Sequence, residues 1–275
     1  MAVTNGWGQG VENNTIEWGK GKDNATNDWG KVYETSASGD TLLEVATPSF
    51  SNTKSVDFDG VDDYVSITNT MTSTTGSYSL WVKPDLTNDR WVIASDANSH
   101  RTFVGVRTLS NGKVRAQVNL SGSEKWKLET DSAVLNSSSW THIVLTHNAT
   151  EAKLYIDGSA VAQTFVSSAD KTAWWNDFSP TTTRIGAWII SGYSNMYWNG
   201  VADEVAIWLS ELSASDITAI YSSGTPASLS SYSPLNWYRM GDGDTFPTLT
   251  DNGSGADNGT MTNMVSGDII TDVPT

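Results

Sequence analysis

The sequence lacks cysteine entirely, and only 17% of its 275 residues are charged. Without cysteine the chain forms no disulfide and has no thiol nucleophile. No apolar run approaches the roughly 18 residues that a membrane-spanning helix needs. The heptads and the Ala/Glu/Lys/Leu/Arg excess of a coiled coil are also missing. These absences exclude a disulfide scaffold, thiol catalysis, a spanning helix and a coiled coil.

The charge that is present is mostly negative, with 31 Asp and Glu against 16 Lys and Arg, a formal net charge of −15. Such a chain repels phosphate backbones, so we expect no nucleic-acid partner. The 13 Trp, together with many Val, Ile and Leu, exclude general disorder. The first residues, MAVTNGWGQG, contain no basic and no apolar stretch, so we expect no signal peptide and no membrane insertion.

A Trp-Gly pair recurs every 11 residues near the N-terminus, at Trp7, Trp18 and Trp29. The Gly and Asn between these pairs are poor helix formers, so residues 1–45 are predicted to form an extended, turn-rich arm. Tryptophan is enriched at interfaces, so the three rings are expected to contact a partner or a neighbouring copy, which predicts anchoring or oligomerisation. The alternative is a solvated leader.

The centre of the chain contains many short apolar or alternating segments separated by Gly, Asn, Asp and Ser, which predicts an antiparallel two-sheet sandwich over 46–234. One helix is expected over 214–221, because Ser213 can cap it and Gly224 can stop it. The fold class is therefore all-β. Residues 235–275 begin with a possible strand, LNWYRM, and the stretch from Gly241 onward has six Asp and no Lys or Arg.

Four blocks of the central region resemble the laminin-G-like domains of the concanavalin A-type jelly roll. They are FDGVDDYV from 58 with YSLWVKP from 78, WTHIVLT from 140, KLYIDG from 153 and NGVADEVAI from 199. The resemblance implies two curved antiparallel sheets. The family's usual opening strand and its Gly-rich turn do not precede Phe58, but residues 235–264 resemble them. Either this C-terminal segment completes the sandwich, as in a circular permutation, or it begins a truncated second copy; the first is preferred because a missing strand would expose a sheet edge.

The arm and the tail over 241–264 also resemble virion proteins of marine tailed phages. This resemblance implies a non-enzymatic virion structural protein made in the host cytoplasm, such as a capsid decoration or a head or tail fibre. Its partners would be other virion proteins and further copies of itself, for example in a trimer, and its surface would contact host glycans. The alternative is a carbohydrate-binding or adhesion module at a cell surface.

Catalytic signals are weak. Glycanases of this fold class carry carboxylates in an E-x-D-x-x-E strand, but Ala206 and Leu209 fill two of those positions after Glu204. No Gly-x-Ser-x-Gly motif occurs. Of the three histidines, His142 is expected to be structural and His147 to be solvent-exposed. A glycanase is therefore the least favoured function, and no catalytic residue is predicted.

No cofactor is required by these patterns, but calcium is possible. Acidic turns supply the oxygen ligands that calcium prefers, and Asp59 and Asp203 are the candidate positions. The alternative is that these carboxylates satisfy their own turns.

An aromatic cluster outside the strand pattern is the candidate contact surface for a glycan or a protein. Its members are Trp174, Trp175, Phe178, Trp188, Tyr193 and Tyr197. The alternative is that the loop buries these rings and closes the core.

Overall fold

The computed structural model describes residues 17–18, 32–36, 39–43, 50–97, 101–189 and 196–275. It divides into two compact units, Met1–Ser51 and Asn52–Thr275. The first contains a three-stranded antiparallel sheet formed by β1 (Glu17–Trp18), β2 (Val32–Ser36) and β3 (Gly39–Leu43). Of the predicted arm contacts, Trp7 and Trp29 lie outside the described residues. Trp18 pairs with Val32 through its backbone.

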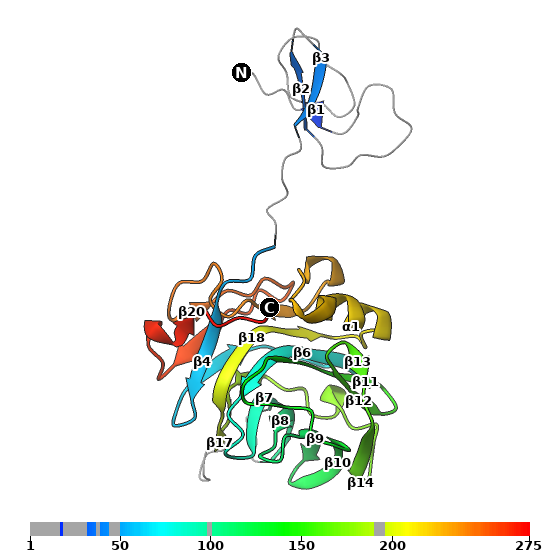
Figure 1. The fold of residues 1–275 in the computed structure, drawn as a ribbon. Coiled ribbons are helices and arrows are strands. Elements are labelled where there is room, and N and C mark those ends of the chain that lie inside the picture. Colours follow the sequence, from blue (N-terminus) through cyan, green and yellow to red (C-terminus); the bar gives the residue numbers. More distant parts are fainter. Residues whose placement is uncertain (1–16, 19–31, 37–38, 44–49, 98–100, 190–195) are drawn as a thin grey trace. The chain divides into compact units, whose positions relative to one another are not determined.

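The second unit is a sandwich of two antiparallel sheets (Figure 1), so the predicted all-β jelly roll with one short helix is confirmed. The nine-stranded sheet has the order β14-β10-β9-β8-β7-β15-β5-β21-β20. Its strands are β5 (Tyr64–Thr68), β7 (Arg90–Asp96), β8 (Phe103–Thr108), β9 (Val114–Leu120), β10 (Ser123–Thr130), β14 (Gln163–Ser168), β15 (Thr182–Ile185), β20 (Thr248–Leu249) and β21 (Gly259–Thr262).

The eight-stranded sheet has the order β13-β12-β11-β6-β18-β4-β22, with β19 also paired to β18. Its strands are β4 (Ser55–Asp59), β6 (Thr75–Pro84), β11 (Thr141–Asn148), β12 (Ala152–Ile156), β13 (Ser159–Ala160), β18 (Asn199–Trp208), β19 (Asn236–Tyr238) and β22 (Ile269–Ile270). A separate hairpin joins β16 (Ala187–Trp188) to β17 (Met196–Tyr197).

The single α-helix, α1 (Ala214–Tyr221), begins where Ser213 accepts a hydrogen bond from the backbone N–H of Asp216. Ile217 and Ile220 are buried, and the Tyr221 ring stacks on Trp81 at 5.5 Å between centroids. The helix therefore covers part of the outer face of the eight-stranded sheet. Short 3-10 turns occupy Trp175–Asp177, Ser222–Gly224, Ser230–Tyr232 and Ser266–Asp268. In the described part of the chain, no helix is long and apolar enough to cross a membrane.

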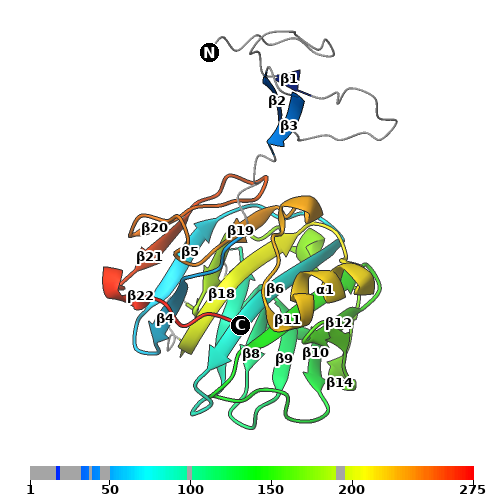
Figure 2. The ribbon, with the colours of Figure 1, turned by 45° about the horizontal axis from the view of Figure 1, so that its top comes forward.

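The C-terminal segment, residues 235–275, contributes strands to both sheets. The strand β21 pairs with β5, β22 pairs with β4, and β19 pairs with β18. Figure 2 shows β21 and β22 beside the blue strands β5 and β4, and the orange β19 beside the yellow β18. The segment thus extends two sheets whose edges would otherwise be open.

A chain of buried hydrogen bonds crosses the interior between the two sheets. The Tyr78 hydroxyl of β6 donates to Ser95 of β7 at 2.6 Å, and Ser95 contacts Thr183 of β15 at 2.7 Å. Thr183 donates to Asn69 at 2.9 Å, and the Asn69 amide donates to Asn236 of β19 at 3.1 Å. All five side chains are buried, so these hydrogen bonds satisfy polar groups that have no contact with water.

Asn236 links this chain to the C-terminal segment. Its amide donates to Asp251 at 2.8 Å and to Asp257 at 3.2 Å. Asp251 also accepts from the backbone N–H of Trp237 and of Gly253. One fully buried amide therefore fixes the turn that leads into β21.

Replacing Asn236 by Ala is expected to reduce the free energy of unfolding by about 2–4 kcal/mol, because the buried Asn69 amide would lose its acceptor and the Asp251 and Asp257 carboxylates would each lose the Asn236 donor. Urea denaturation of N236A measures this loss. The matched control is N88A, since Asn88 is exposed and hydrogen-bonds only to the adjacent Thr87. Equal midpoints for the two variants would contradict the assignment.

Candidate functional site

The predicted contact at Trp174 and Trp175 is wrong, because both rings are fully buried. Trp174 stacks on His147 at 4.7 Å, and the Trp175 indole donates to the Tyr78 hydroxyl at 3.1 Å. A Cβ at Gly76 would lie 2.1 Å from the Trp175 ring, so the glycine makes the space that this ring fills. These two residues close the core, which was the alternative interpretation.

The other predicted aromatic residues occupy different environments. Phe178 is partly buried and packs against the main core. Tyr197 is partly buried with its ring 6.3 Å from that of Tyr64. Tyr193 lies outside the described residues. Trp188 packs on the outer face of the nine-stranded sheet, away from the main core.

The outer face of the nine-stranded sheet contains a second aromatic cluster. Along β8, Val104 and Val106 belong to the core, so Phe103, Gly105 and Arg107 point outward by strand alternation. Phe103 packs against Trp91 at 4.9 Å, and Trp188 lies over both, at 4.3 Å from Phe103 and 5.6 Å from Trp91. Trp91 and Phe103 are buried, whereas Trp188 retains exposed surface.

The β16–β17 hairpin brings Trp188 to this face. Gly186, with φ of +83°, turns the chain out of β15, and its carbonyl accepts from the Trp198 N–H at 2.8 Å where the hairpin closes. A Cβ at Gly186 would lie 2.4 Å from the Phe58 ring, so only glycine fits there.

A polar strip continues from the aromatic cluster across the sheet. Trp91, Arg107, Arg115 and Glu129 are consecutive register partners on β7, β8, β9 and β10, so their side chains lie in one row. The Arg107 guanidinium lies over the Trp91 ring at 5.1 Å from its centroid. Arg115 pairs with Glu129 at 2.5 Å.

The next outward positions of β9 are amides. The Gln117 amide donates to Asn119 at 2.7 Å and to Glu124 at 3.0 Å, and Lys127 pairs with Glu124 at 2.7 Å. The strip thus offers amide and guanidinium donors on rigid strands beside a partly exposed indole. Such an arrangement suits a ligand with one apolar face and a rim of hydroxyl groups.

The acidic pair Asp203 and Glu204 lies elsewhere, at a bulge of β18, and both side chains are at most 2% exposed. Asp203 accepts from the Asn52 amide at 2.7 Å, and Glu204 accepts from the Trp237 indole at 2.5 Å. Burial, with the neighbouring Glu204, raises the pKa of Asp203 well above its usual range, and burial raises the pKa of Glu204 to about 7. Both carboxylates are therefore shielded from solvent. Through Asn52 and Trp237 they link the beginning of the sandwich unit to its C-terminal segment.

The two calcium candidates, Asp59 and Asp203, lie in different surroundings. Asp203 is fully buried, and its two oxygens accept from the Asn52 amide and from the backbone N–H of Glu204, so calcium at Asp203 stays a prediction. Asp59, Asp62 and Asp63 lie together, yet Asp59 accepts from the N–H groups of Val61 and Asp62 as in an ordinary turn. Calcium at Asp59 therefore stays a prediction.

Both described histidines are structural. His147 is fully buried, so the expected exposure is wrong; its two ring nitrogens lie within 3.2 Å of the carbonyls of Thr74 and Lys171. His142 contacts the Ser79 hydroxyl through Nε2 at 2.8 Å and lies against the rings of Trp81 and Tyr221. Because the Ser79–His142 pair is buried beneath α1, it cannot act on an external substrate.

Burial lowers the pKa of His142 from 6.5 to about 3. The neutral ring therefore stabilises the fold fully above about pH 6.5, and this contribution is lost as the pH falls toward 3. Between pH 6.5 and 4, the stability advantage of the wild type over H142Q should shrink by about 1.4 kcal/mol per pH unit. Denaturant titrations across that range measure it, and parallel profiles for the two proteins would contradict the assignment.

Comparison with known proteins now places the fold. The model of the concanavalin A-like lectin/glucanases superfamily matches residues 59–218, more than half of the chain. The chain therefore belongs to that superfamily. No curated protein matches it.

The solved structures show the same architecture at low identity. A Bacteroides ovatus protein, to which carbohydrate binding has been ascribed, is 15% identical with a TM-score of 0.56, covering 86% of this chain and 68% of that one. A heptameric pentraxin from Limulus polyphemus is 12% identical with a TM-score of 0.48, covering 62% and 82%. The CBM40 of a Ruminococcus gnavus sialidase, bound to α2,3-sialyllactose, is 11% identical with a TM-score of 0.47, covering 62% and 100%. These likenesses concern the fold alone.

Sequence reasoning identified Trp188 but missed the outward residues that surround it. Trp91, Phe103, Arg115 and Gln117 lie within segments that the sequence predicts to be strands, and Arg107 directly follows one of them. The available signal was the alternation of Val104 with Val106, and of Val114, Ala116 and Val118, which fixes the outward positions between them.

Proposed function

We propose that the jelly roll is a non-catalytic carbohydrate-binding module that contacts glycans through the outer face of its nine-stranded sheet. The observation that carries this proposal is the partly exposed Trp188 ring, held over Trp91 and Phe103 beside the polar strip. Membership of the lectin/glucanase superfamily supports it.

The chemistry of a sugar suits this face. A pyranose ring has an apolar C–H surface that packs on an indole, and its hydroxyl groups accept and donate hydrogen bonds at the rim. Trp188 supplies the aromatic surface, while Gln117, Asn119 and Arg107 supply planar polar groups from adjacent strands. Because strands rather than loops hold these groups, binding costs little ordering entropy.

The carboxylates support binding rather than hydrolysis. Asp203 and Glu204 are buried away from the face. On the face itself, Glu124 and Glu129 are ion-paired at 2.7 and 2.5 Å, and Asp96 pairs with Arg184 at 2.5 Å. A glycosidase needs one free acid and one free nucleophile or base, and ion pairing opposes the raised pKa of such an acid.

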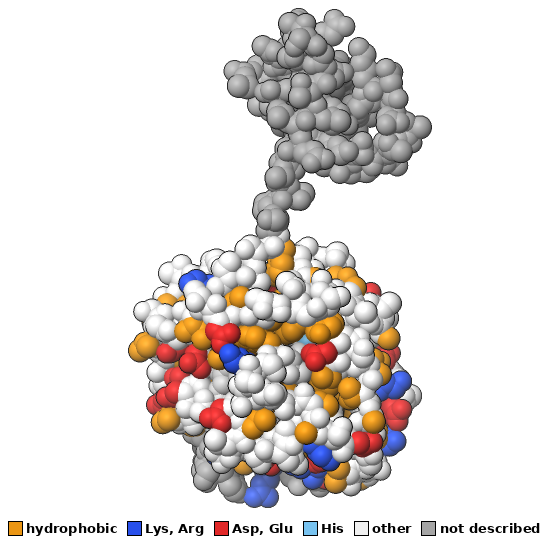
Figure 3. Space-filling view, viewed as in Figure 1, with side chains coloured by type: hydrophobic (Ala, Val, Ile, Leu, Met, Phe, Trp, Pro, Cys, Tyr) orange, Lys and Arg blue, Asp and Glu red, His pale blue; other side chains and the backbone are white. Residues whose placement is uncertain are grey.

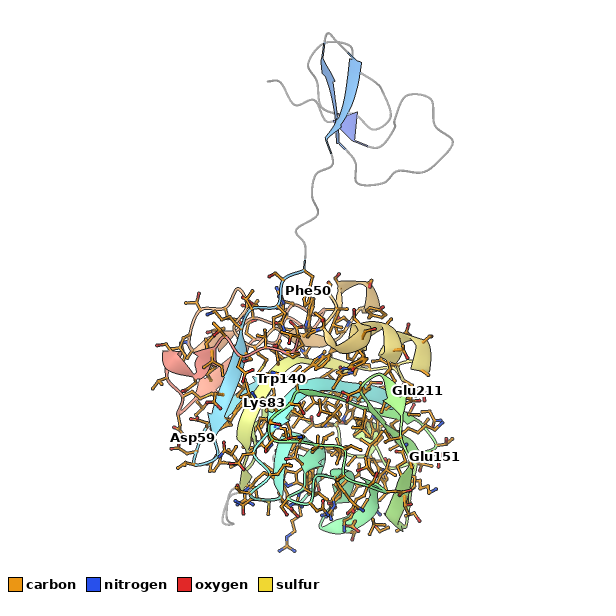
Figure 4. The ribbon with its side chains drawn as sticks, viewed as in Figure 1. Phe50, Asp59, Lys83, Trp140, Glu151 and Glu211 are labelled. Atoms are coloured by element: carbon orange, nitrogen blue, oxygen red, sulfur yellow. The ribbon has the colours of Figure 1, made fainter. Side chains whose placement is uncertain are left out.

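Replacing Trp188 by Ala should weaken glycan binding about tenfold or more, because the stacking surface is lost. Binding to a glycan array, followed by calorimetry on the strongest hit, measures the effect. The matched control is W140A, because Trp140 is also partly buried but lies by the eight-stranded sheet. Its indole donates to Asp272, which also pairs with Lys83 of β6, and Figure 4 labels Trp140 and Lys83 side by side. Unchanged binding by W188A, or equal loss in W140A, would contradict the proposal.

We further propose that a phage particle displays this module, with the arm as its anchor and host-surface glycans as its target. The resemblance of the arm and tail to virion proteins supports this setting. On the face that Figure 3 shows, charged side chains are few and scattered among uncharged polar groups and backbone, which is consistent with outward display. A cell-surface adhesion module is the alternative setting.

Mass spectrometry of purified particles should detect the protein, and deleting residues 1–45 should release it from them. If the deleted protein still sediments with particles, the arm is not the anchor. If particles lack the protein while the gene is expressed, the virion setting is wrong and the adhesion alternative stands.

A further inference from the structure

The arginines of this acidic chain are concentrated on one sheet. The sequence has six Arg, and five of them, all except Arg239, lie on β7, β8, β9 or β15 or in the turn before β8. Three of the five, Arg90, Arg107 and Arg115, surround one end of the polar strip.

Arg107 and Arg115 are directly opposite each other on β8 and β9. Like charges in opposite register positions repel, so this placement costs stability unless negative charge compensates it. Each side chain remains accessible, at 15% and 22% exposed respectively.

The available carboxylates do not complete that compensation. Glu129 is committed to Arg115, which donates to it through Nε at 2.7 Å. Asp89 accepts from the Ser110 N–H and hydroxyl at 2.8 and 3.0 Å, and comes no closer than 4.0 Å to Arg107.

Arg107 is thus held in place but incompletely bonded. It donates to the Asp89 carbonyl at 3.3 Å and lies over Trp91, while its Nε is buried without a partner among the described residues. Arg90 likewise donates to the Asp89 carbonyl, at 2.9 Å. Burial, with the neighbouring Arg115, lowers the pKa of Arg107, as expected where positive charge exceeds negative. Around this end of the strip, three guanidinium groups face two carboxylates.

We propose that the Arg107 end of the polar strip binds the anionic group, a carboxylate or a sulfate ester, of an acidic sugar unit whose ring or neighbour packs on Trp188. The inference rests on the proposed function and names its substrate class. A guanidinium accepts planar oxyanions through parallel N–H donors, and an incoming anion would supply the negative charge that the strip lacks.

A glycan array carrying neutral glycans and their sialylated, uronic-acid and sulfated counterparts tests the inference with the full chain. The strongest hits should be anionic, and each neutral counterpart should bind about 10- to 100-fold more weakly, the range expected for a charged hydrogen bond. Preference between the carboxylate and sulfate series identifies which anion is bound. Affinity for these hits should fall as salt concentration rises.

Three variants separate this role from a structural one. R107Q should lower affinity for the anionic hits about 10- to 100-fold and affinity for neutral glycans much less, because glutamine keeps a planar amide donor and removes only the charge. E129Q should raise affinity for the same hits, because it frees Arg115 from its carboxylate; a purely structural role would make both variants bind more weakly. The control is K153Q, which removes one positive charge at an exposed position of β12 in the other sheet.

The two proposals fail differently. If neutral glycans bind as well as anionic ones, and binding depends on Trp188 but not on Arg107, the acidic-sugar inference is overturned while the binding module stands. If no glycan binds, both are overturned.

Discussion

The buried amide of Asn236 is the interaction on which the sandwich unit depends. It joins the hydrogen-bonded chain that crosses the interior from Tyr78 to the turn at Asp251. The same segment is also paired through its backbone with β5 and β4. A single, fully buried polar side chain therefore connects both sheets to the segment that extends them.

The way in which the sandwich is closed determines which surface stays available. Helix α1 and the residues around Asp272 pack on the outer side of the eight-stranded sheet, and the acidic pair of β18 is sealed beneath Asn52 and Trp237. The nine-stranded sheet instead presents a compact aromatic cluster next to an arginine-rich polar strip. A rigid sheet that carries these groups without ordering a loop is suited to recognition, which is why we propose binding at this face.

Much of the fold was predictable, because a two-residue period and turn residues mark the strands, and Ser213 with Gly224 marks the helix. The burial of Trp174 and Trp175 was not, since it depends on space left by Gly76, about a hundred positions earlier in the chain. The candidate face also escaped prediction. Which residues belong to this face depends on which side chains of each strand point outward. A bulge between Trp91 and Ile93 shifts the inward and outward alternation along β7. Trp188 was recognised because an aromatic residue outside the strand pattern is visible locally.

The most direct test of the binding face is a ¹H–¹⁵N NMR titration of the protein with the strongest glycan hit. We expect shifts in the Trp188 indole N–H and in the backbone amides around Arg107 and Gln117, with the Trp140 indole unchanged. Shifts confined to Trp140, Lys83 and the outer side of the eight-stranded sheet would contradict it.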